Sequence, residues 1–119
     1  MIPHFLKIWI KQRGREAKKI IKIRVDTLDN IFKKYLPPGV EIDFLTIDVE
    51  DYEYKILRSL NYDKYAPKLL LIEDLGFYNK NKDFMEYRET EMYKFLTMKG
   101  YIVAAKTWYT ILFKRKDHE

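Results

Sequence analysis

The feature that most constrains the fold is a short apolar run that ends in acidic residues and occurs twice. The first run covers residues 42–49 and leads into an acidic stretch at 48–51. The second covers residues 69–72 and leads into Glu73 and Asp74. A nearly continuous apolar run of this length is typical of a strand that is buried on both faces, as in a parallel sheet. Each run therefore predicts a buried strand.

Helical patterns alternate with these predicted strands. Thr27 is suited to cap a helix, and apolar residues follow it at positions 28, 31, 32 and 35, the spacing of one helical face. The stretch 37–39 (PPG) ends that helix, because proline cannot continue it. A second helix is predicted after residue 52, and a third ends at Lys99, before a glycine that suits the position after a helix.

The C-terminal part of the chain predicts an antiparallel pair of strands, residues 102–105 and 110–113, on either side of a turn. Residues 20–25 form a β-rich run, and residues 75–88 have the composition of a loop. Because strands and helices alternate, we predict an α/β protein with mainly parallel strands and an antiparallel hairpin at the end.

Positive charge is concentrated near the N-terminus. Residues 1–36 hold ten Lys or Arg side chains against three Asp or Glu, whereas the rest of the chain is close to neutral. Such an arm is compatible with a nucleic acid or a phosphorylated ligand, and equally with a solvated face. We favour the solvated face and do not expect a nucleic-acid partner, because no nucleic-acid-binding motif accompanies the charge.

Several classes of protein are excluded by composition. The chain contains no cysteine, which excludes disulfides, thiolate zinc sites and a cysteine nucleophile. No apolar run approaches the roughly 20 residues that span a bilayer, and the N-terminus lacks the features of a signal peptide. We therefore expect a cytoplasmic protein without a membrane partner.

Candidate chemistry lies in the acids that follow the predicted strands, Asp48 and Glu50 after one and Glu73 and Asp74 after the other. In an open parallel sheet the carboxyl ends of the strands line the ligand site, so these carboxylates are expected to converge. They would then act as a general base or hold a divalent metal. The alternative is that they only favour the start of a helix. The four glycines are isolated, so no glycine-rich phosphate loop is present.

Residues 43–53 (DFLTIDVEDYE) resemble a motif of the FkbM-type methyltransferases, which use S-adenosylmethionine. That family typically shows TLD, DFLKIDVEGxE, PxxxxxE and LxxxGY in this order, followed by a closing hairpin. The corresponding stretches here are 27–29, 43–53, 67–73, 96–101, 103–107 and 111–115. The resemblance runs over roughly residues 25–115. Asp51 stands where the family usually has glycine, and Thr46 where it often has lysine.

The resemblance implies the C-terminal half of a Rossmann-like methyltransferase sheet. The family's cofactor half would precede residue 25, and 24 residues are too few to encode it. We therefore expect a basic arm (1–24), a methyltransferase-like half-domain (25–116) and a tail (117–119), with no S-adenosylmethionine bound by this chain alone. The resemblance also implies that Asp48, Glu50 and Glu73 are catalytic, as general base or as groups that orient the acceptor. Whether the chain is itself an enzyme stays open.

Three functions remain in competition. The first is a truncated methyltransferase domain, whose family reaction transfers a methyl group to a hydroxyl of a small molecule or sugar. The second is a non-catalytic module that forms a homo-oligomer, or binds a partner chain, through an unfinished sheet edge and the apolar residues 1–10. The third is a metal-dependent nuclease, which is weakened because no lysine follows Glu73 at the position such sites commonly use.

Overall fold

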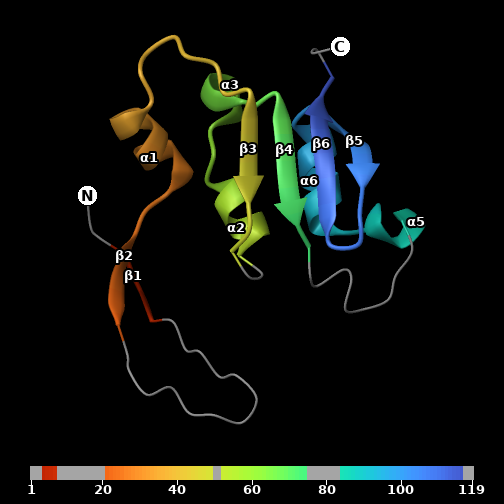
Figure 1. The fold of residues 1–119 in the computed structure, drawn as a ribbon, viewed down its shortest axis with the longest axis horizontal. Coiled ribbons are helices and arrows are strands. Elements are labelled where there is room, and N and C mark those ends of the chain that lie inside the picture. Colours follow the sequence, from red (N-terminus) through yellow and green to blue (C-terminus); the bar gives the residue numbers. More distant parts are fainter. Residues whose placement is uncertain (1–3, 8–20, 50–51, 75–83, 117–119) are drawn as a thin grey trace.

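The computed structural model describes residues 4–7, 21–49, 52–74 and 84–116 of the 119-residue chain (Figure 1). Strands and helices alternate through most of this part. The elements are, in chain order, β1 (His4–Lys7), β2 (Lys22–Val25), α1 (Leu28–Tyr35), β3 (Phe44–Ile47), α2 (Glu53–Arg58), α3 (Tyr62–Tyr65), β4 (Leu69–Glu73), α5 (Phe84–Tyr87), α6 (Glu91–Met98), β5 (Tyr101–Lys106) and β6 (Thr110–Arg115). The short helix α5 lies where a loop was expected, and residues 75–83 and 117–119 fall outside the described residues.

The main sheet has four strands in the order β3-β4-β6-β5. The β3–β4 pair is parallel, while β6 is antiparallel to both β4 and β5. The α/β class and the closing antiparallel hairpin are thus confirmed. The expectation of mainly parallel pairing is wrong for this sheet, because β6 lies between β4 and β5 and runs the other way (Figure 1). Three of the four strands share a direction, but only one neighbouring pair is parallel.

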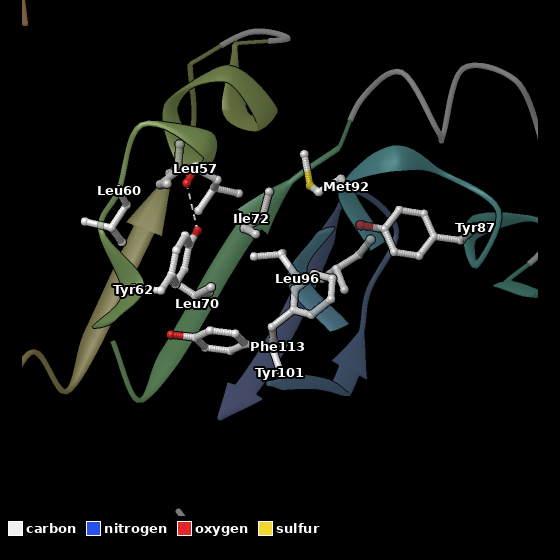
Figure 2. Close-up of a cluster of buried hydrophobic side chains, with 12 residues drawn as sticks. Leu57, Leu60, Tyr62, Leu70, Ile72, Tyr87, Met92, Leu96, Tyr101 and Phe113 are labelled. Atoms are coloured by element: carbon white, nitrogen blue, oxygen red, sulfur yellow. Dashed lines mark hydrogen bonds between the residues drawn. The ribbon is translucent and has the colours of Figure 1, made fainter. Parts of the chain in front are cut away.

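The hydrophobic core of the described residues lies between one face of this sheet and the helices that cover it (Figure 2). Along β4 and β6 every second residue is buried, so the sheet contributes alternate side chains to the core. Fully buried side chains from both layers meet there: Leu57, Leu70, Ile72, Leu96, Tyr101 and Phe113.

The opposite face of the sheet is only partly covered. Leu69, Leu71 and Leu112 are half-buried, and Phe44 on β3 keeps 49% of its surface exposed. The expectation of strands buried on both faces is therefore wrong within the described residues. The apolar runs in the sequence supply two apolar faces, but the described helices bury only one of them.

Helix α1 begins where its cap predicts and contacts the core over less of its surface than expected. The hydroxyl of Thr27 accepts a hydrogen bond from the Asn30 N–H at 3.2 Å, as an N-cap should. Leu28 and Phe32 pack against the core, and the Phe32 ring meets Tyr65 edge-on at 5.5 Å. Two further residues of the predicted apolar face, Ile31 and Tyr35, remain exposed. Only half of that face is used within the described residues.

Two buried tyrosines connect the helical layer to the sheet. The Tyr62 hydroxyl donates to the Leu57 carbonyl at 2.9 Å, and the Tyr101 hydroxyl donates to the Pro67 carbonyl at 2.5 Å. Their rings meet edge-on with centroids 6.0 Å apart. Burial raises the pKa of Tyr62 well above its ordinary value, and the nearby Tyr101 adds to the effect. These contacts hold α3 and the start of β4 against β5.

The strands β1 and β2 form a separate antiparallel pair beside α1 (Figure 1). Its register runs from His4 opposite Val25 to Lys7 opposite Lys22. All of this pair except Val25 lies in the predicted arm, and the division between arm and half-domain stays a prediction. No helix among the described residues is long and apolar enough to cross a membrane.

Candidate functional site

The register of the parallel pair β3–β4 brings two of the predicted site residues to the same end of the sheet. Ile47 is opposite Ile72, so Asp48 and Glu73 follow one position later on adjacent strands. Neighbouring strands lie about 4.8 Å apart, which places the two backbones close together. Asp48 is exposed and Glu73 is half-buried. Glu50 lies outside the described residues, so the structure does not place the third predicted residue.

The turn between β5 and β6 borders this carboxyl end of the sheet. Glu73 is opposite Thr110 in the β4–β6 ladder. The backbone N–H of Asp74 donates to the carbonyl of Tyr109 at 2.8 Å. Asp74 is therefore held beside the turn, next to the position of Glu73.

Glu53, at the start of α2, is a functional candidate that sequence reasoning did not select. Its side chain is only 5% exposed, and its Oε1 accepts a hydrogen bond from the Val49 N–H at 2.9 Å. This bond ties the segment after β3 to α2 and so helps to position Asp48. The available signal was the final glutamate of the family-like motif, which lies in the same stretch as the selected acids.

The chemistry available at the carboxyl end of the sheet is that of hydrogen-bond acceptors. The carboxylates of Asp48 and Glu73 can accept a proton or orient a hydroxyl group. In the described part of the chain, no group of three or more His, Asp or Glu side chains is arranged to hold a metal ion. The metal-dependent nuclease hypothesis gains no support from these residues.

A hollow of about 740 Å³ lies at the opposite, amino end of the sheet. Residues 36–42, which precede β3, form one side of it, and Lys99 and Gly100, which precede β5, lie on another. Sequence reasoning missed this hollow because its lining comes from segments that are far apart in the chain. In the sequence, only the basic stretches at 33–34 and 114–116 indicated positive charge near this hollow.

The fold and the site together define an α/β protein with a mixed sheet whose parallel strands carry acids at their carboxyl ends. The chain belongs to the FkbM methyltransferase family: the family model described as "Methyltransferase FkbM domain" matches residues 3–103. This confirms the resemblance; the family is one of Rossmann-like methyltransferases, and its members use S-adenosylmethionine. No curated protein and no solved structure matches the chain.

Asp48 and Glu73 at the carboxyl end of the sheet could accept hydrogen bonds from the ammonium and hydroxyl groups of S-adenosylmethionine, but not from its carboxylate. The amino-acid carboxylate of this cofactor needs a cation or free N–H donors. The side chains of Asp48 and Glu73 are acceptors, and the N–H groups of Val49 and Asp74 already donate to Glu53 and to the turn after β5. A partner for the carboxylate of the cofactor would therefore have to come from other residues.

Proposed function

We propose that this chain forms the acceptor side of an FkbM-type methyltransferase that methylates a hydroxyl group of a small molecule or sugar. The observation that carries the proposal is the parallel register that brings Asp48 and Glu73 to one end of the sheet. Together with Glu50, these carboxylates would orient the acceptor and take up the proton of its hydroxyl.

We further propose that a cofactor-binding half, from the same polypeptide or a partner chain, packs beside β3. Nine of the fourteen exposed large apolar side chains in the described part lie between residues 21 and 52, on β2, α1, β3 and their connections. In the same part, β3 pairs only with β4, which leaves its other edge open. An open edge and an apolar surface are features that proteins usually cover. On this proposal, the 119-residue chain alone is inactive.

Calorimetric titration with S-adenosylmethionine tests the half-domain proposal. The 119-residue chain should give no measurable binding, because the N–H groups of Val49 and Asp74 at this end of the sheet already donate within the protein. Binding with micromolar affinity would contradict the proposal and would mean that the site is assembled by another route.

Neutralising the acids tests their role separately from cofactor binding. If Asp48 and Glu50 only favour the start of α2, the Asp48→Asn/Glu50→Gln variant should lose at most about 1 kcal/mol of stability. If they form an acidic site, their mutual repulsion is relieved and the variant should gain stability. We expect this gain in stability. We also expect millimolar magnesium to change the melting temperatures of the parent protein and of the variant little or not at all. A magnesium-dependent rise that the double substitution abolishes would favour the nuclease instead.

Self-association is a second candidate function, favoured by the open edge of β3. If two copies pair there, Phe44→Lys should weaken the dimer in sedimentation equilibrium, because Phe44 is exposed on that strand. Ile102→Lys is the matched control, since Ile102 is similarly exposed on β5 at the other side of the sheet. A parent protein that stays strictly monomeric at high micromolar concentration would count against this function.

A further inference from the structure

The hollow at the amino end of the sheet is lined by an excess of positive charge. Five cationic and two acidic residues line it: Lys33, Lys64, Lys99, Arg115, Lys116, Glu41 and Asp63. They come from α1, α3, the end of α6, the end of β6 and the connection into β3. The tertiary structure thus brings the five cations together from four separate parts of the chain.

The positions of three lysines have a partial structural explanation. Lys33 and Lys64 lie in the last turns of α1 and α3, and Lys99 directly follows α6. Cations at helix C-termini are favourable because they face the negative end of the helix dipole. This explains each lysine singly. The α/β topology brings the three helix ends together, because each of these helices leads into a strand, but it does not require the further cations at the end of β6.

Among the described residues, acids do little to neutralise the lysines at the three helix ends. Glu41 pairs with Lys68 at 3.2 Å, and Lys68 lies outside the lining of the hollow. Lys33, Lys64 and Lys99 take part in no ion pair with any described residue. Among the acids of the lining, this leaves Asp63 to face the cations.

The remaining lining suits an organic ligand. The ammonium groups of Lys64 and Lys99 lie 5.1 Å and 5.8 Å from the ring centres of Tyr65 and Tyr62, respectively, which holds them at the wall of the hollow. Both rings line it, together with Pro37, Pro38 and Val40. The volume of about 740 Å³ lies in the range of small-molecule sites. A nucleic acid would instead require an extended basic groove with stacking platforms.

We propose that this hollow is a binding site for a small phosphorylated organic molecule that carries at least two negative charges. Its phosphate groups are held by the lysines at the ends of α1, α3 and α6 and by the basic end of β6, and its organic part lies against the tyrosines and prolines. The site is at the opposite end of the sheet from Asp48 and Glu73, so it is distinct from the proposed acceptor site and does not depend on it.

Isothermal titration with pyrophosphate tests the proposal on the full 119-residue chain. We expect a dissociation constant below about 1 mM at moderate salt, and weaker binding as sodium chloride is raised. The Lys33→Gln/Lys64→Gln variant removes two of the five cations and should weaken binding roughly tenfold, which corresponds to about 1.4 kcal/mol. The matched control is Lys22→Gln/Lys55→Gln, which makes the same charge change at exposed positions on β2 and α2.

Each alternative outcome overturns the proposal. Absence of binding at millimolar pyrophosphate would remove the site. An equal loss in the control variant would reduce the effect to overall charge. Binding of a single-stranded oligonucleotide without binding of pyrophosphate would assign the surface to nucleic acid. Circular dichroism and melting curves of both variants verify that the fold is kept, which is expected because all four lysines are exposed.

Discussion

The hydrogen bond between Glu53 and the Val49 N–H offers the sharpest test of how the segment after β3 is held. Glu53→Ala removes a buried carboxylate whose Oε1 lies 2.9 Å from that N–H. A hydrogen bond to a charged group contributes about 1.5–3 kcal/mol. Val49 is itself exposed, so water can partly replace the lost acceptor, and we expect the lower end, about 1.5–2 kcal/mol. In a domain of this size that corresponds to a fall in melting temperature of roughly 5–10 °C.

Glu91→Ala is the matched control for this prediction. Glu91 also lies in the first turn of a helix, α6, so it has the same favourable interaction with the helix dipole, worth about 0.3–1 kcal/mol. Its side chain is exposed, whereas that of Glu53 is buried. The difference between the two losses, measured by urea unfolding followed by circular dichroism, isolates the buried hydrogen bond.

Hydrogen exchange gives an independent measurement of the same contact. The Val49 amide should exchange faster in Glu53→Ala than in the parent protein, while amides in the middle of β4 keep their relative protection. Glu53→Gln keeps an oxygen acceptor and should fall between the parent and the alanine variant. Equal losses of stability in the Glu53 and Glu91 variants, with unchanged exchange at Val49, would refute the reasoning.

The remaining predictions concern the core. Burial raises the pKa of Tyr62 and Tyr87, so the folded protein keeps protons that the unfolded chain releases above about pH 10. The contribution of each tyrosine to stability should therefore be constant below that pH and then fall by up to about 1.4 kcal/mol per pH unit in urea titrations. Tyr101→Phe should cost about 1–2 kcal/mol in the same assay, because the Pro67 carbonyl loses its buried donor. Leu57→Ala should cost about 2–5 kcal/mol in thermal unfolding, because the side chain is fully buried.

Exposed residues provide the controls for these core predictions. Tyr52→Phe removes a hydroxyl from an exposed ring and should change stability little, and the same holds for truncation of Ile102 to alanine. A stability that stays level between about pH 9 and about pH 11 would contradict the tyrosine prediction. Losses in the control variants that equal those of Tyr101→Phe and Leu57→Ala would show that burial is not the cause.

The sequence by itself determined the features that depend only on residues close together in the chain. The cap of α1 at Thr27, the end of α6 before Gly100 and the closing hairpin all follow from side chains within a few positions of the structure they specify. Gly100 has a φ of 94°, a left-handed conformation in which glycine is favoured because it has no Cβ. The family resemblance rests on the same kind of information, a series of short motifs in a given order.

The candidate site was only partly predictable. Acids after two apolar runs indicated a shared end of the sheet, and the parallel register of β3 and β4 brings Asp48 and Glu73 there. The pairing itself joins residues 25 positions apart, from Phe44 opposite Leu69 to Ile47 opposite Ile72. Glu53 was not selected, because an acid at the start of a helix is ordinarily exposed and its burial depends on how α2 packs.

Only the tertiary structure decided which apolar surfaces are buried and how distant charges are grouped. Contacts between remote segments place β6 between β4 and β5 and cover one face of the sheet. They also determine that Phe32 is packed while Ile31 and Tyr35 remain exposed. The basic hollow is of the same kind, since its cations come from the ends of three helices and of β6. A periodic pattern indicates which residues share a face. Whether that face is buried depends on the element that packs against it, and the tertiary fold of the whole chain determines which element that is.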